Sequence, residues 1–181
     1  FDADEKAKPN ALRPWTIAVL KGVFEVSLGE DITYMLAPLL AMDRQIKVDE
    51  RFGEPRTYKN TIEVELDTAK DKIAVLATIT EEGRMRVIRI GDYWLDFVPT
   101  GRLLVFQNHD RPGVIGRIGT TLGEAGVNIA NFSLGRKAGS GLAFGALEID
   151  GNVEAELREE LIRNGDMVWL AACALPEAEQ A

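Results

Sequence analysis

The amino-acid sequence predicts an α+β protein in two parts, and three features lead to that expectation. Apolar residues recur at helical spacing between residues 16 and 40. Apolar and polar residues then alternate with a period of two between residues 61 and 98. A turn at 99–101 is followed by a regular order of short strands and helices up to residue 175. Helical spacing indicates amphipathic helices, and strict alternation indicates half-buried strands.

The first part is expected to begin with two helices. The first starts near Thr16 and ends at Gly29. A second is predicted from Asp31, which can cap its first turn, because apolar residues follow at the spacing of a buried stripe. Pro38 lies inside that stripe, so we expect a kink or two short helices near Ala37.

Four short strands should follow as an antiparallel meander. In TIEVEL, Ile62, Val64 and Leu66 alternate with polar residues, which predicts one buried face. Turn residues at 82–83 and 91–92 indicate hairpins. The other three strands are expected at residues 72–80, 85–90 and 93–98.

The second part has the order βαββαβ. Strands are expected at residues 102–108, 127–134, 142–149 and 167–175, and helices at residues 113–125 and 153–163. Asn152 should cap the second of these helices, and Asn164-Gly165 should end it. This order makes a four-stranded antiparallel sheet with two helices on one face, the ferredoxin-like arrangement.

The length of 181 residues fits two small domains. The expected division is a tail at 1–12, domains at 13–99 and 100–176, and a second tail at 177–181. Because the chain begins at Phe1 rather than Met, we expect it to be processed or to be a piece of a longer protein.

Composition argues against several classes of function. There are 21 Lys and Arg against 29 Asp and Glu, a net charge of −8, so no nucleic-acid or anionic-membrane surface is expected. One cysteine and one histidine cannot make a disulfide framework, a cysteine cluster or a histidine-rich metal site. We see neither a membrane span nor a signal peptide, and we expect a cytoplasmic protein.

Residues for catalysis are scarce, and no catalytic residue or metal ligand is predicted. Cys173 lies in a strongly apolar strand, where we expect a buried, inert thiol. Nothing around His109 resembles a nucleophile elbow, so a solvated loop side chain is expected. The acidic pairs Glu81-Glu82 and Glu159-Glu160 are interpreted as solvated faces.

Four glycines follow the strand at 102–108, superficially like a dinucleotide-binding loop. Their spacing is three, three and four residues, which does not fit G-x-G-x-x-G. Gly116, Gly119 and Gly123 instead form a helical stripe. Because each helical glycine costs ~1 kcal/mol relative to alanine, the stripe indicates a close backbone contact. That contact is either with its own sheet or with a subunit or ligand.

The segment NHDRPG, residues 108–113, is the best candidate for a binding site. Asn108 and Asp110 precede a helix N-terminus, whose free N–H groups favour an anion. A free amino acid matches this chemistry, with its ammonium on Asp110 and its carboxylate on the helix end. Asn128, which opens the next strand, could add its amide. Alternatively, Asp110 only caps the turn and Asn128 only shapes the connection before it.

NHDRPGVIGRIGTTLGEAGVNIANFSLGR resembles the first half of an ACT domain of the D-3-phosphoglycerate dehydrogenase kind. VLKGVFE, the AP of MLAPLLA, and RVIRIGDYWLDFVPTG resemble the intervening allosteric substrate-binding domain of the long form of that enzyme. The resemblance covers about residues 13–175. It implies the C-terminal regulatory region of this family, with no cofactor in this chain and NAD in a nucleotide-binding part expected before Phe1.

In that family L-serine, the pathway product, binds where two ACT domains meet and inhibits the enzyme. Asp110 and Asn128 match serine-contacting positions, and Asn108 stands at a third, where His or Tyr is often found. The candidate ligand residues are Asn108, Asp110, Gly113, Val114 and Asn128.

The intervening domain of some members of this family holds an anionic effector on basic residues. Arg86 matches one of these positions, whereas Tyr93 and Val98 stand where others carry Arg. Arg86 is therefore the one candidate here for an anion site.

The strand VNIANFSL should lie at a sheet edge, without charge or proline to protect it, which predicts a homodimer or tetramer through paired edges. Two other functions stay open. One is the regulatory region of an iron–sulfur L-serine dehydratase, and the other is a stand-alone ACT sensor of another amino acid.

Overall fold

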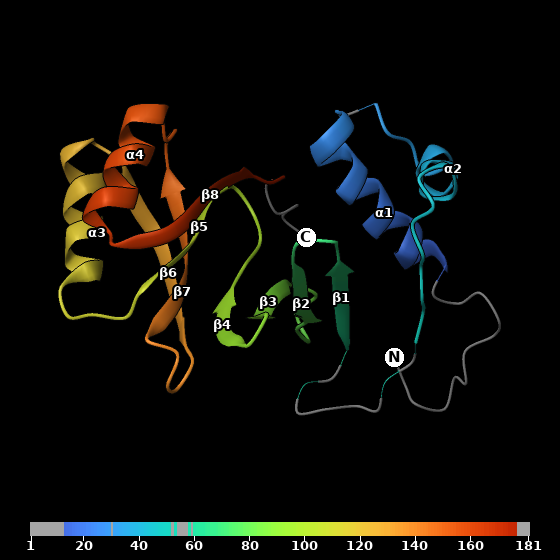
Figure 1. Cartoon of the computed structure of the whole chain (residues 1–181), viewed down its shortest axis with the longest axis horizontal. Helices are drawn as coiled ribbons and strands as arrows, with labels where there is room; N and C mark the ends of the chain where they lie inside the picture. Colours follow the sequence, from blue (N-terminus) through green and yellow to red (C-terminus); the bar gives the residue numbers. More distant parts are fainter. Residues whose placement is uncertain (1–12, 30, 52, 54–57, 59, 177–181) are drawn as a thin grey trace. The chain divides into compact units, whose positions relative to one another are not determined.

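The computed structural model describes residues 13–29, 31–51, 53, 58 and 60–176. The chain divides into two compact units, residues 1–59 and residues 60–181. Helices α1 and α2 belong to the first, and α3, α4 and strands β1–β8 belong to the second (Figure 1). The predicted α+β class with two antiparallel sheets is confirmed. The predicted tails lie outside the described residues.

Helix α1, Arg13–Leu28, ends where the sequence indicated. Gly29 follows it with φ 98°, a left-handed backbone that glycine adopts without a Cβ clash. Phe24 is the buried residue of this helix and packs with Ile32, Ala37 and Ala41, so the two helices share a small core of their own.

Helix α2, Leu36–Asp43, begins later than predicted, and Asp31 does not cap it. The N-cap is Met35, and Thr33 before it accepts a hydrogen bond at Oγ1 from the Leu36 N–H at 3.1 Å. Pro38 is the third residue of the helix rather than an interior one. The first turn tolerates proline because its N–H groups have no intrahelical acceptor, which explains the later start.

The first sheet is the predicted antiparallel meander, in the order β1-β2-β3-β4. Val64 of β1 lies opposite Val75 of β2, and Val75 lies opposite Ile90 of β3, so apolar residues line up across one face. The strands are β1 Thr61–Asp67, β2 Lys72–Ile79, β3 Met85–Ile90 and β4 Tyr93–Phe97.

The second sheet has the order β6-β7-β5-β8, and α3 and α4 cover one of its faces (Figure 1). This is the predicted ferredoxin-like βαββαβ unit, and β6 is an edge strand as expected. The elements are β5 Arg102–His109, α3 Val114–Glu124, β6 Asn128–Arg136, β7 Leu142–Asp150, α4 Ala155–Asn164 and β8 Met167–Ala174.

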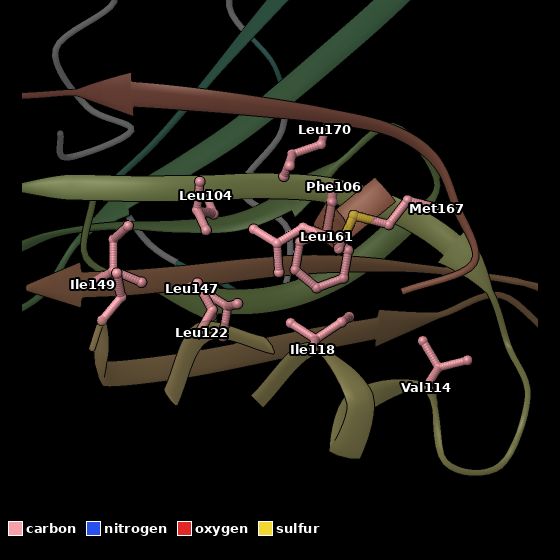
Figure 2. Packing of buried hydrophobic residues seen from close by; sticks show 11 residues of the cluster. Leu104, Phe106, Val114, Ile118, Leu122, Leu147, Ile149, Leu161, Met167 and Leu170 are labelled. Atoms are coloured by element: carbon pink, nitrogen blue, oxygen red, sulfur yellow. The ribbon is translucent and has the colours of Figure 1, made fainter. Parts of the chain in front are cut away.

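The helix-covered face contains a core built from both helices and the two central strands. Figure 2 shows Leu104 and Phe106 of β5 gathered with Ile118 of α3 and Leu147 of β7. Leu161 of α4 is fully buried in the same cluster. The cluster therefore fixes α3, and with it the loop before α3, against the sheet.

The other face of the second sheet shares a hydrophobic cluster with the first sheet. Leu103, Phe144 and Ala146 pack there with residues of β3 and β4. A Cβ at Gly135 of β6 would lie 2.5 Å from the Trp94 carbonyl oxygen, so glycine lets β4 approach closely. The domain boundary predicted at 99/100 falls inside this unit and stays a prediction.

Three local expectations in the second unit were wrong. Strand β1 lacks the predicted buried face, because it is an edge strand in which Ile62 and Leu66 are exposed and Val64 is half-buried. Helix α4 has Glu154 rather than Asn152 as its N-cap, without a capping side-chain hydrogen bond. Cys173 is exposed instead of buried. An apolar sequence predicts a buried strand, but β8 lies at an edge of the sheet, where fewer neighbours cover it.

The glycine stripe of α3 does not pack on its own sheet. No described atom lies within 4 Å of a Cβ built at Gly116, Gly119 or Gly123. Packing of the stripe on its own sheet is therefore wrong, and contact with a subunit or ligand stays a prediction.

Candidate functional site

Asn108 is the next-to-last residue of β5 and the most deeply buried polar residue among those that the structure describes. It is only 2% exposed. Its Nδ2 donates to the His109 carbonyl oxygen at 2.8 Å, but Oδ1 is buried without a donor among the described residues. A buried acceptor left unsatisfied costs about 1–3 kcal/mol. A ligand or partner that brings a donor to this oxygen is therefore favoured.

Asp110 follows β5 directly and is held by the hairpin between β6 and β7. Its main-chain N–H donates to the Gly141 carbonyl oxygen at 2.9 Å. Its Oδ1 lies 3.2 Å from Nη2 of Arg136, the last residue of β6, and its side chain is 30% exposed. In the described part of the chain Oδ2 has no partner, so one carboxylate oxygen stays available to a ligand.

Asp166, which sequence reasoning missed, anchors the loop that carries Asp110. Its carbonyl oxygen accepts the His109 N–H at 3.1 Å, and its Oδ2 lies 3.2 Å from Arg111 Nη1. Its Oδ1 is 3.5 Å from His109 Nδ1, so His109 is part of this cluster rather than a simple solvated side chain. Asp166 has φ 49°, a conformation that Asp tolerates better than most residues. The turn residues Asn164-Gly165-Asp166 were the signal in the sequence.

The N-terminus of α3 has no side-chain cap. Its N-cap is Gly113, with φ 83°, where a residue with a Cβ would be strained. The N–H of Val114 has only a long contact of 3.4 Å to the Arg111 carbonyl oxygen. Uncapped N–H groups at a helix N-terminus suit an anion such as a carboxylate.

Within one chain, Asn128 lies far from these residues. It begins β6, pairs with Asp150 of β7, and donates from Nδ2 to Asp150 Oδ2 at 3.1 Å. Arg136, which contacts Asp110, is eight residues further along the same strand, roughly 25 Å at the usual rise per residue. The structure thus brings Asn108, Asp110, Gly113 and Val114 together and leaves Asn128 at the opposite end of the sheet.

Arg86, the candidate for an anion site, lies on β3 and is paired. Its Nε lies 2.5 Å from Asp96 Oδ1 on β4. An anion would therefore compete with a carboxylate of the same sheet.

Lys137 connects the β6–β7 hairpin to the first sheet. Its Nζ lies 2.6 Å from Asp92 Oδ2 in the turn between β3 and β4. The hydrogen bond from Lys137 lowers the pKa of Asp92, and the same bond raises the pKa of Lys137. The adjacent residues Arg136 and Lys137 thus form ion pairs with different parts of the unit, Arg136 with Asp110 and Lys137 with Asp92.

The described residues offer neither a metal site nor a membrane span. They contain no group of three or more His, Cys, Asp or Glu side chains placed to hold a metal ion. None of their helices is long and apolar enough to cross a membrane.

The fold and the strand–helix junction define an ACT-type domain that follows another α+β domain. Residues 102–166 match the family model of the ACT domain, and residues 5–91 match that of the D-3-phosphoglycerate dehydrogenase intervening domain. The chain therefore belongs to the D-3-phosphoglycerate dehydrogenase family and corresponds to its C-terminal regulatory region.

Curated relatives agree with this assignment. D-3-phosphoglycerate dehydrogenase of Methanocaldococcus jannaschii is 33% identical over 144 residues, which cover 80% of this chain and 27% of the relative. The Bacillus subtilis enzyme is 32% identical over 162 residues, 89% of this chain and 31% of its own length. That of Archaeoglobus fulgidus is 32% identical over 151 residues, 82% and 28% of the two chains. The chain thus spans less than a third of these relatives.

Proposed function

We propose that this chain is the serine-sensing region of a cytoplasmic D-3-phosphoglycerate dehydrogenase. L-Serine binds at the junction of β5 and α3, where two ACT domains meet, and its binding inhibits the NAD-dependent oxidation of 3-phosphoglycerate. The main support for this proposal is the buried Asn108 Oδ1, which has no donor among the described residues, close to the Asp110 carboxylate, of which only Oδ1 is paired. An ammonium supplies donors for both, once a small local adjustment opens the buried oxygen to it.

The open edge of β6 supports assembly through this strand. An edge strand presents unpaired N–H and C=O groups, and antiparallel pairing of two such edges would give an eight-stranded sheet. Antiparallel pairing places the start of one strand beside the end of the other. Asn128 of one subunit then approaches the Asp110 end of its partner, which would reunite the residues that one chain keeps apart. Pairing of the two β6 edges gives a homodimer, and a second contact between such dimers would give a tetramer.

The ligand acts by favouring one arrangement of the two subunits. It bridges them, so its binding energy differs between arrangements, which is the requirement for allosteric coupling. The two sheets of the second unit share a hydrophobic cluster, so a displacement of the second sheet would also displace the first. We place the hydride transfer, with its NAD, in a nucleotide-binding part encoded upstream of Phe1.

Titration calorimetry with L-serine, glycine and other amino acids tests the ligand and its site. Serine should give heat with the 181-residue chain, and the double variant Asp110→Ala, Asn128→Ala should lose it. Glu159→Ala, an exposed carboxylate of α4, is the control and should bind as the unmodified chain does. Heat that survives in the double variant would show that serine binds elsewhere.

Sedimentation with and without serine tests the assembly. A chain that stays monomeric at high protein concentration in both conditions contradicts binding between subunits. Reading the gene upstream of Phe1 tests the parent enzyme. A βαβ unit with G-x-G-x-x-G supports it, whereas a start codon near Phe1 favours a stand-alone sensor.

A further inference from the structure

We propose that Arg136 is a specificity residue of the amino-acid site, which binds the α-carboxylate of the ligand while Asp110 binds its ammonium. This inference rests on the proposed function and goes beyond it, because the carboxylate was so far assigned only to the end of α3. Arg136 therefore makes the site selective for a zwitterion over an amine.

The register of the sheet places Arg136 on the ligand side. Arg136 of β6 lies opposite Ala143 of β7, and Ala143 lies opposite Asn108 of β5. Residues directly opposite each other in neighbouring strands point to the same face. Asn108 and Arg136 therefore face the same side of the sheet, with only the methyl group of Ala143 between them.

Both members of the Asp110–Arg136 ion pair keep hydrogen-bonding groups that a ligand can use. The guanidinium Nη2 is 3.2 Å from Asp110 Oδ1, and the Arg136 side chain is 67% exposed. A guanidinium has five N–H donors in a planar fork, so its contact with Asp110 leaves donors for a second carboxylate. Asp110 keeps Oδ2 for an ammonium. An α-amino acid carries both groups on one carbon and can bridge the pair, ammonium to Asp110 and carboxylate to Arg136.

The other cations near the site are committed to structural partners. Arg111 lies on Asp166, and Arg117 donates from Nε to the Asn164 carbonyl oxygen at 2.8 Å. Lys137 forms an ion pair with Asp92, in the turn between β3 and β4 of the first sheet. Arg136 differs from these three because its only partner in the described structure is Asp110, itself a proposed ligand group.

Comparison of L-serine with L-serinamide isolates the contribution of the carboxylate to binding, because the amide keeps the ammonium and the hydroxyl. Calorimetry on the unmodified chain should show tighter binding of serine. Arg136→Gln should weaken serine about tenfold, the expected loss for one charge-assisted carboxylate contact, and should leave serinamide unchanged or slightly tighter. Arg136→Lys, which keeps the charge but not the fork, should recover part of the serine affinity.

Lys137→Gln is the matched control, because it removes a neighbouring charge of the same sign. It should leave the preference for serine over serinamide as it is. The role of Arg136 is wrong if Arg136→Gln weakens both ligands equally or changes neither. Because Arg136 is exposed, its variant should keep the urea midpoint of the parent, which separates lost binding from lost folding.

The same titrations distinguish the failure of this inference from that of the proposed function. If the unmodified chain and the assembled protein bind no amino acid, both fail. If Asp110→Ala abolishes serine binding and Arg136→Gln does not affect it, only the role of Arg136 fails, and the carboxylate belongs to the end of α3.

Discussion

Replacing Gly135 by alanine should force the two sheets of the second unit apart. The new Cβ would lie 2.5 Å from the Trp94 carbonyl oxygen and 3.1 Å from Tyr93 Cβ. A main-chain oxygen cannot swing away as the end of a flexible side chain can. Strand β4 therefore has to move away from β6.

The size of the effect follows from the distance that is missing. Carbon–oxygen contacts are normally about 3.3–3.6 Å, so the strands must separate by roughly 1 Å. A gap of that size forfeits up to about half of the dispersion energy of the atoms facing it. Those atoms belong to the cluster around Leu95, Phe97 and Phe144. We expect the free energy of unfolding to fall by about 2 kcal/mol, within the range of overpacked cores.

Urea denaturation followed by circular dichroism measures this loss. Gly123→Ala in α3 is the matched control, because no described atom lies within 4 Å of its Cβ. Alanine is the better helix former, so this variant should unfold at a higher urea concentration, by up to ~1 kcal/mol. Equal urea midpoints for Gly135→Ala and the parent would mean that β4 does not approach β6 as closely as described.

Three further predictions concern single residues of the second unit. Lys137→Gln should raise the pKa of Asp92 toward its usual 3.8, as NMR titration of the carboxyl carbon would show. In the parent this carboxylate contributes stability above pH 3.8 that is lost as the pH falls through its lowered pKa, and the variant should lack this contribution. Asn108→Leu removes an unsatisfied buried oxygen, so the free energy of unfolding in urea should stay equal or rise by up to ~1 kcal/mol. Calorimetry should show serine binding weakened at least about tenfold. A destabilised variant would contradict the assignment of that oxygen. Leu161→Ala leaves a cavity at a fully buried position and should lower the free energy of unfolding by about 2–5 kcal/mol. A loss under about 1 kcal/mol would mean that α4 does not pack into this core.

Periodicity predicted the elements well because it reports burial along a single element. The spacing in α3 reflects one buried face, which was found where expected. The alternation in TIEVEL predicted the strand correctly but not its burial, since Ile62 and Leu66 are exposed. The edge position of β6 followed from the βαββαβ order alone. The capping residues of the helices were harder to predict than the helices themselves. Asp31 has the residue type of a helix cap, but Pro38 is tolerated only in a first turn, so α2 begins at Leu36 with Met35 as its N-cap.

The site was predicted only as far as neighbouring residues could show it. Asn108, Asp110 and Gly113 are close in the sequence, so their grouping was visible there. Arg136 and Asp166 reach the same loop through the sheet register and the turn after α4, which a linear pattern does not show. The exposure of Cys173 likewise depends on which strand lies outermost.

The separation of Asn128 from Asp110 has a consequence for stoichiometry. With the β6 edges paired as proposed, each chain gives its Asp110 end to one site and its Asn128 end to the other, so a dimer holds two shared sites and a monomer none. Apparent serine affinity should then increase with protein concentration. A mixed dimer of one Asp110→Ala chain and one Asn128→Ala chain should contain one intact site and one that lacks both residues. Half of the mixed dimer's binding capacity should therefore return when two inactive variants are combined.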